Sequence, residues 1–153
     1  MQRTSFKTMD CPIALGLESV GEWWSILILR DAFYGLTRFD QFQKSLQIAP
    51  NMLTRRLKAL VASGLLEQRL YSARRRDYVL TDRGREFWPV LVTLHAWGER
   101  HFAQGPKAVV LVEAASGAEA SPQLVDRRNG KALAADAYAF KPGPGSQAVT
   151  KPA

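Results

Sequence analysis

The order of hydrophobic and polar residues predicts helices along the first part of the chain. Pro12 suits the first turn of a helix that runs to about Val20, after which Gly21 interrupts the pattern. The segment 24–34 is apolar nearly all round and is followed by Gly35, a residue that commonly ends helices. We therefore expect this second helix to lie at the centre of the core.

Two shorter amphipathic helices are predicted next, with a turn at residues 47–49 between them. The first spans Phe39 to Leu46, with its apolar residues at helical spacing. The second begins at Pro50, a residue favoured at the first position of a helix, and ends at Gly64. Its inward stripe consists of Leu53, Leu57, Leu60 and Val61. The pair has the form of a helix-turn-helix.

A β-hairpin is expected to follow the helix pair. Residues 65–71 and 76–81 alternate between apolar and polar, which predicts two strands joined by a tip at residues 72–75. The expected fold class is therefore mainly α with a small β-hairpin, a winged helix-turn-helix, plus a short β-like C-terminal appendix.

One long final helix is predicted after the hairpin. Thr81 or Asp82 can cap it, and it runs to about Phe102, with Pro89 either kinking it or lying near its first turns. Short β-like segments follow, and the Pro- and Gly-rich composition from Lys141 onward predicts disorder.

Positive charge is concentrated in the predicted helix pair and hairpin. Lys and Arg number eleven between residues 38 and 85, against four Asp and Glu, so this stretch carries +7, as much as the whole chain. Such a segment favours a polyanionic partner. A helix fits the major groove of B-form DNA and a hairpin reaches the phosphates beside it, so the expected partner is double-stranded DNA.

The outward face of the second helix of the pair supplies the expected base contacts. Asn51, Met52, Thr54, Arg55 and Lys58 lie away from the apolar stripe or flank it. Arg55 can pair with guanine and Asn51 with adenine, while Met52 can contact a thymine methyl group. Arg56 is adjacent to the stripe and is assigned to a phosphate. The alternative is a solvated helix face with no partner.

Three consecutive arginines, Arg74, Arg75 and Arg76, lie at the predicted hairpin tip. They repel one another unless a counterion or a row of phosphates is present, which favours a contact with the DNA phosphate backbone. Arg38, at the start of the first helix of the pair, is included among the DNA contacts. Protection of the sheet edge against aggregation is the alternative, although a single charge serves that purpose.

The ordered set of residues around these elements resembles the HxlR-type winged helix-turn-helix regulators. The matching pieces are Cys11-Pro12, Gly21-x-x-Trp24-Ser25-x-Leu27-Ile28-Leu29-Arg30, Arg38-Phe39-x-x-Phe42, Pro50-x-x-Leu53-Thr54-x-Arg56-Leu57, Gly64-Leu65-Leu66 and Asp77-Tyr78-x-Leu80-Thr81-x-x-Gly84. They cover about residues 9–100. The resemblance implies a homodimeric bacterial transcription regulator, and its two-fold symmetry implies a near-palindromic operator.

The resemblance also implies a dimer contact made by the first and last helices. Those are the helix with Ile13 and Leu17 and the helix with Trp88, Leu91 and Trp97. The last helix has more large apolar residues than one small core needs, although they can also simply cover the domain. The implied domains are a DNA-binding and dimerisation domain over 1–104, a small β-rich appendix over 105–140, and a disordered tail over 141–153.

Three positions depart from the family pattern. Trp23 replaces a residue that is usually basic, and Asp77 replaces the usual Glu of the wing. Ala49 stands where a Ser commonly caps the second helix of the pair, so this cap is weaker by ~1 kcal/mol unless another group supplies it.

Cys11 stands where many members of the family carry a cysteine that senses oxidants or electrophiles. A thiol near a helix N-terminus has its thiolate favoured by the helix dipole. Because the chain has one cysteine, oxidation yields an intersubunit disulfide or a mixed disulfide with a small thiol. Modulation by oxidation of Cys11 or by a small-molecule effector is therefore one hypothesis, and an inert, partly buried thiol is the alternative.

Residues 105–140 resemble a small zinc-ribbon appendix of some longer regulators of this type. Ser116, Asp126 and Asn129 stand near the places of its paired cysteines. Thiolate and imidazole ligands are absent, so a degenerate ribbon without metal is expected.

Other classes of function receive less support. The chain lacks a paired nucleophile, a Gly-rich phosphate loop and a clustered carboxylate pair, so we expect neither an enzyme nor a cofactor. It also lacks an apolar stretch of ~18 residues, so no membrane partner and a cytoplasmic location are expected. A winged helix used for protein contacts, without specific DNA binding, is the alternative function.

Overall fold

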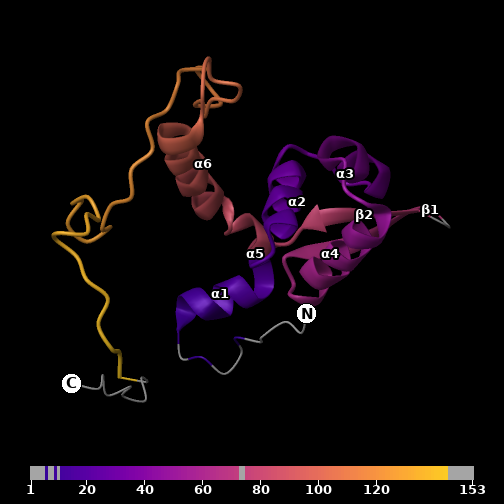
Figure 1. Ribbon diagram of the computed structural model, residues 1–153, viewed down its shortest axis with the longest axis horizontal. Helices are drawn as coiled ribbons and strands as arrows, with labels where there is room; N and C mark the ends of the chain where they lie inside the picture. The colour runs from indigo at the N-terminus through magenta and orange to yellow at the C-terminus, as the bar shows by residue number, and fades with distance from the viewer. Residues whose placement is uncertain (1–5, 7–8, 10, 73–74, 145–153) are drawn as a thin grey trace. The chain divides into compact units, whose positions relative to one another are not determined.

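The computed structural model describes residues 6, 9, 11–72 and 75–144, and the chain divides into two units at Trp88–Pro89. The elements of the first unit, in the described residues, are α1 (Pro12–Val20), α2 (Trp23–Phe33), α3 (Phe39–Leu46), α4 (Pro50–Ala62), β1 (Leu66–Ser72), β2 (Arg75–Leu80) and α5 (Asp82–Arg85) (Figure 1). Helix α6 (Trp88–Phe102) follows at the division. The winged helix-turn-helix fold class is thereby confirmed.

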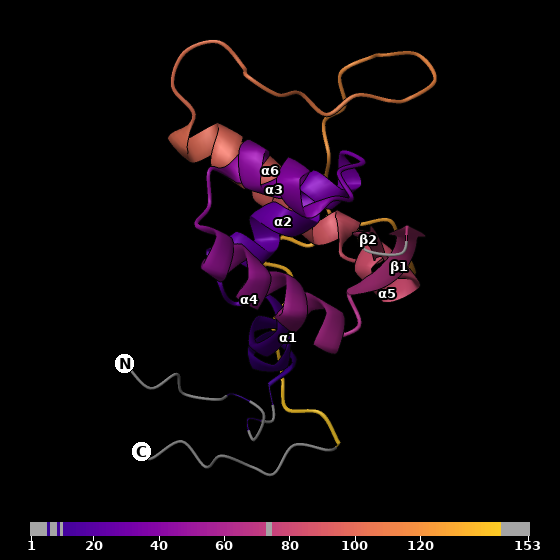
Figure 2. The same cartoon turned by 90° about the vertical axis from the view of Figure 1, so that its right-hand side faces the viewer.

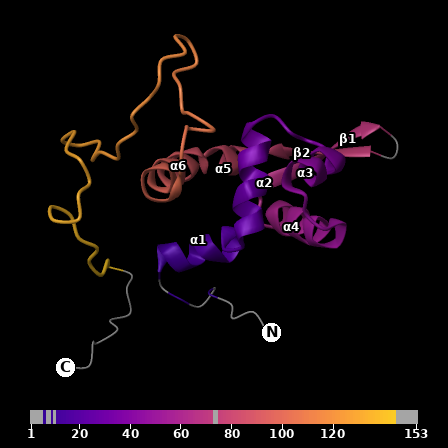
Figure 3. The same cartoon turned by 45° about the horizontal axis from the view of Figure 1, so that its top comes forward.

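Helix α2 lies at the centre of the first unit, as its apolar sequence predicted. It packs against α3 and α4 (Figure 3). Its Ile28 and Leu29 have no exposed surface. The fully buried partners from the two other helices are Phe42, Leu53, Leu57 and Leu60. Full burial of each such side chain contributes roughly 1.5–3 kcal/mol, so this cluster holds the helix pair in place.

The turn between α3 and α4 is tight. Gln47 adopts the left-handed conformation with φ 50°, which is uncommon for a residue other than glycine. Ile48 follows it and is 3% exposed. The buried Ile48 side chain therefore anchors the turn to the core and fixes the angle at which α4 leaves α3.

The hairpin is a two-stranded antiparallel sheet that packs against α2 and α4 (Figure 2). Leu66 lies opposite Leu80 and Leu70 opposite Arg76, with an irregularity between Leu70 and Ser72. The Tyr78 backbone N–H donates to the Thr37 carbonyl at 2.7 Å. This bond ties the hairpin, here called the wing, to the segment that enters α3.

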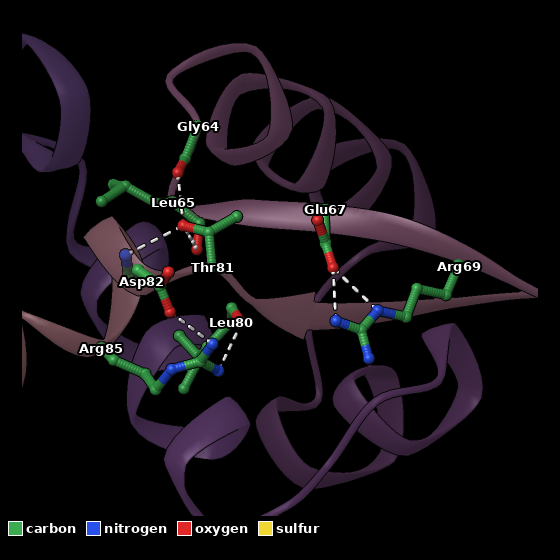
Figure 4. Close-up of polar contacts among 9 residues, drawn as sticks. Gly64, Leu65, Glu67, Arg69, Leu80, Thr81, Asp82 and Arg85 are labelled. Carbon is green, nitrogen blue, oxygen red and sulfur yellow. Dashed lines mark hydrogen bonds and ion pairs between the residues drawn. The ribbon is translucent and has the colours of Figure 1, made fainter.

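A threonine closes the corner at the base of the wing. The Thr81 hydroxyl donates to the Gly64 carbonyl at 2.6 Å and accepts from the Gly84 N–H at 3.0 Å (Figure 4). A Cβ at Gly84 would lie 2.0 Å from the Leu65 carbonyl oxygen, so no larger residue fits there. Asp82 pairs with Arg85 at 2.8 Å on the outer side of the corner. The corner thus joins the end of α4 to the end of β2.

The predicted single long final helix is wrong. Thr81 does cap a helix, but α5 ends at Arg85 and α6 begins at Trp88. Pro89 lacks an N–H to donate to the Arg85 carbonyl, and its ring clashes with that carbonyl in a continuous helix. The break therefore falls one turn before the proline.

The second unit contains most of α6 and the appendix. Two isolated antiparallel bridges, Val112 with Glu119 and Val125 with Ala132, each close a short turn. Lys107 bonds to Glu119, and this hydrogen bond raises the pKa of the lysine. The division at Trp88–Pro89 differs from the predicted domain boundary at residue 104, and that boundary stays a prediction. The predicted disorder of the tail also stays a prediction, because residues 145–153 lie outside the described residues.

No single helix in the described part of the chain is long and apolar enough to cross a membrane. The consecutive helices α1 and α2 reach the required length and composition only together, and the break between them bends by 76°.

Candidate nucleic-acid interface

The outward face of α4 has the composition expected of a base-contacting surface. Asn51, Thr54, Arg55 and Lys58 are all exposed, and their spacing places them on one side of the helix. Met52 is half-buried and packs against the core, while its sulfur accepts a hydrogen bond from the Arg55 guanidinium at 3.3 Å. This face therefore presents amide, hydroxyl, guanidinium and ammonium groups to a partner.

The N-terminus of α4 has no side-chain cap. Ala49 occupies the N-cap position and provides no hydrogen-bonding side chain, and Pro50 follows at the first helical position. The next backbone N–H groups are thus left without a cap acceptor. Such N–H groups, together with the helix dipole, bind phosphate oxygens well.

A second basic feature lies between the start of α3 and the wing. Arg38, Phe39 and Asp40 line one side of a groove of about 570 Å³, and Arg75, Arg76 and Tyr78 line the other. We call it the arginine groove. Asp40 is largely exposed and its carboxylate lies 3.9 Å from Arg38, so the lining side chains carry a net charge of +2.

Backbone and side-chain hydrogen bonds position the two sides of the arginine groove. The Tyr78–Thr37 hydrogen bond brings β2 against the residue that precedes Arg38. The Gln41 side-chain oxygen accepts from the backbone N–H groups of both Thr37 and Arg38 at 3.0 Å. Across the wing, Arg76 donates to the Gln68 side chain at 2.7 Å. Arg38 and the wing arginines are therefore positioned by α3 and β2 jointly.

Arg56 does not lie on the exposed surface, and its assignment to a phosphate is wrong. Its side chain is only 6% exposed and pairs with Glu22 at 2.9 Å. Glu22 is the N-cap residue of α2. Arg56 lies at the edge of the apolar stripe, where tertiary packing turns it inward, so it joins α4 to α2.

Apart from Arg56 and from Met52, which is half-buried against the core, the predicted DNA contacts in the described residues are exposed or half-exposed. Arg75 and Arg76 are exposed on β2, and Arg38 is half-exposed. Arg74 lies outside the described residues. Tyr78 and Gln68, which lie opposite each other in the strand register, were not among the predicted contacts. For Tyr78, its position two residues after Arg76 was the available signal, whereas Gln68 meets Arg76 only across the strand pair.

The predicted dimer residues are apolar side chains that the single chain leaves largely uncovered. Ile13 on α1 is 60% exposed and Trp97 on α6 is 54% exposed. Leu17 and Trp88 are also exposed, although Trp88 contacts Phe33 with ring centroids 5.0 Å apart. Leu91 is half-buried. None of the described residues of α6 is buried.

Cys11 lies at the N-terminus of α1. It is the N-cap residue, its thiol is partly exposed, and its carbonyl accepts the first helical hydrogen bond from Leu15 at 3.0 Å. The Cys11 side chain therefore lies near the N-terminal end of the α1 dipole, as expected from the sequence.

The ribbon-like turns of the appendix are held by side-chain hydrogen bonds. In the first turn Ser116 donates to Glu113, and in the second Asn129 donates to Asp126 at 3.3 Å. The Tyr138 hydroxyl joins the second pair. Among the described residues, no three His, Cys, Asp or Glu side chains form a group that could hold a metal ion.

Comparison with known proteins places this architecture in a family. Residues 19–106 match the model of the HxlR-like helix-turn-helix family. The chain is 36% identical over 140 residues to Rv3095 of Mycobacterium tuberculosis, an HTH-type transcriptional regulator, covering 89% of this chain and 88% of that protein.

Two solved structures extend the comparison. PA1607, described as a candidate transcription factor, is 42% identical with a TM-score of 0.82, covering 90% of this chain and 99% of its own. The redox regulator HypR in its oxidised form is 28% identical with a TM-score of 0.56, covering 61% of this chain and 100% of its own. The family consists of transcriptional regulators, which are not enzymes. The chain belongs to the HxlR-like helix-turn-helix family of transcriptional regulators.

Proposed function

We propose that the protein is a homodimer that binds a near-palindromic operator in double-stranded DNA. In this proposal α4 enters the major groove, where Asn51, Thr54 and Arg55 contact base edges. The wing and the start of α3 hold the flanking phosphates. The observation that carries the proposal is the arginine groove, because it joins exposed guanidinium groups from two separate segments beside few carboxylates.

Each DNA-contacting residue has a distinct expected role. A bidentate contact from Arg55 to guanine discriminates against other bases by roughly 1–3 kcal/mol. Arg38, Arg75 and Arg76 contact phosphates, which adds affinity on every sequence and carries no base preference. Lys58, one turn farther along the exposed face of α4, belongs with the phosphate contacts.

Selection of bound sites from a random DNA pool tests this proposal. The expected product is an inverted repeat with half-site centres ~34 Å apart, one turn of the duplex. Arg55→Ala should lose preference at one or two base pairs in each half-site. Lys58→Ala, a matched removal of one positive charge from the same helix, should keep the full preference. Enrichment of no sequence by the wild-type protein argues against operator binding and favours a module for protein contacts.

The proposed dimer uses α1 and α6. In this assignment α6 belongs functionally with residues 1–104, although it lies mostly in the second compact unit. The exposed apolar side chains of both helices support it, since isolated subunits rarely leave so many large residues in water. Light scattering should give twice the chain mass of 17.1 kDa. Ile13→Glu together with Trp97→Glu should give the single-chain mass, while a dimer unaffected by both changes would place the contact elsewhere.

Regulation by oxidation of Cys11 is the accompanying hypothesis. The partly exposed thiol at the start of α1 supports it, and HypR, to which the chain is similar, is a redox regulator. Because α1 is assigned to the dimer contact, a modified Cys11 would act on the relative placement of the two α4 helices. Cys11→Ser should abolish the effect of an oxidant such as diamide on DNA binding and leave reduced-state affinity intact. If the oxidant still changes DNA binding of the serine variant, Cys11 is not the sensing residue.

A further inference from the structure

The face of the wing that covers the core at its base continues toward the tip. Residues directly opposite each other in an antiparallel pair share a face, and every second residue of a strand lies on it. The three pairs on this face are Leu66 with Leu80, Gln68 with Tyr78, and Leu70 with Arg76. Leu66 is 1% exposed, and Tyr78 and Leu80 pack against the core. The strands then run out past α3 and α4, so the face is uncovered near the tip (Figures 1 and 3).

Leu70 lies on this uncovered part of the wing. Among the wing residues whose side chains the structure describes, it is the large apolar one that is exposed, with 75% of its surface accessible. An irregularity in the strand pairing follows between Leu70 and Ser72. Such irregularities bend a strand and change the direction of its side chains. Leu70 is therefore an apolar group presented at the outer end of the wing rather than a part of the core.

The residues around Leu70 are mostly cationic. Arg69 precedes it in β1, Arg76 lies opposite it, and Arg75 precedes Arg76 in β2; all three arginines are exposed. Two copies of this tip would repel each other, which disfavours a contact with a second copy of the chain. An anionic partner that also offers apolar surface, as the grooves of DNA do between their phosphates, matches both Leu70 and the arginines.

We propose that Leu70 packs into the minor groove of DNA beside each half-site and opens a base step there, an inference that rests on the proposed DNA-binding function. Apolar side chains used in this way partly unstack neighbouring base pairs and bend the duplex by roughly 20–90°. Arg75 and Arg76 hold the phosphates around the step, and α4 contacts base edges in the adjacent major groove.

This contact makes Leu70 a determinant of sequence preference outside the base pairs that α4 contacts. A TA step deforms readily, whereas an AA step within a run of adenines is stiff. Because the cost of opening a step depends on its sequence, the protein should prefer TA at the flanking position that Leu70 reaches. This preference is separate from that of Arg55, which acts within the half-site.

Binding of the full-length chain to a series of duplexes tests the proposal. Each duplex carries the inverted repeat that the wild-type protein selects, with one TA step at successive positions outside the half-sites, and its reference has AA at the same place. At one position the wild-type protein should bind the TA duplex about tenfold more tightly than its reference. Leu70→Ala should reduce this ratio to less than about twofold. Förster transfer between dyes at the two ends of that duplex should report a bend with the wild-type protein and a straighter duplex with Leu70→Ala.

Two further variants separate a direct contact from a general loss. Leu70→Met keeps a long apolar side chain and should retain both the affinity ratio and the bend. Leu124→Ala, at a leucine of the appendix that is 52% exposed, should behave as the wild-type protein does. Equal ratios for the wild-type protein and Leu70→Ala overturn the role of Leu70 but leave operator binding standing, because both proteins still bind the inverted repeat. Selection of no repeat by the wild-type protein overturns both.

Discussion

The pair formed by Glu22 and Arg56 should stabilise the fold far more than the surface ion pairs do. Glu22→Gln keeps the shape of the side chain but removes the charge that faces a 94% buried guanidinium at 2.9 Å. Breaking a fully buried pair costs about 3–5 kcal/mol. Glu22 is itself 35% exposed, so water screens part of the interaction, and we expect a loss of about 2 kcal/mol in the free energy of unfolding.

Urea denaturation followed by far-ultraviolet circular dichroism measures this loss. The matched control is Glu67→Gln, which breaks a pair with Arg69 at 2.7 Å on the wing, where both side chains are about half-exposed. That control should cost less than about 1 kcal/mol. The double variant Glu22→Gln with Arg56→Met should recover part of the loss, because no buried charge then remains without a partner. Equal losses for Glu22→Gln and Glu67→Gln would refute the assignment of Arg56 to a structural role.

Two further changes test the local structure around α4. Ala49→Ser supplies the missing N-cap acceptor and should raise the free energy of unfolding by about 1 kcal/mol in the same urea assay; no gain would mean that another group already satisfies the α4 N-terminus. Thr81→Val removes the hydroxyl that bonds to both Gly64 and Gly84 and should lower it by about 1–3 kcal/mol, whereas Thr93→Val, on exposed α6, should change it little.

Local patterns predicted the helices well because each carried its own boundary signals. Pro12 and Pro50 mark the starts of α1 and α4, and the observed ranges Pro12–Val20 and Phe39–Leu46 match the predicted ones. The predicted strands of the wing, 65–71 and 76–81, differ from the observed strands by one residue at each end. Helical or alternating spacing decides these elements before any tertiary contact forms.

The errors arose where distant residues decide the outcome. Arg56 points inward because Glu22, 34 positions earlier, meets it there, and no local pattern records that pairing. The arginine groove likewise depends on the bond between Tyr78 and Thr37, which connects segments that sequence analysis treated separately. The break before α6 was the exception, since Pro89 signalled it locally and the capacity of proline to end a helix was underweighted.

The most direct test of the DNA-binding account is the salt dependence of binding to duplex DNA. Each phosphate contact contributes about 0.9 to the slope of log affinity against log salt. Replacing Arg38, Arg75 and Arg76 by Ala should flatten that slope by up to about 3 per subunit and weaken binding to all sequences alike. Replacing Arg127, Arg128 and Lys131, three exposed cations of the appendix, removes the same charge and should leave the slope unchanged. Equal slopes for the wild-type protein and the groove variant would contradict the central claim.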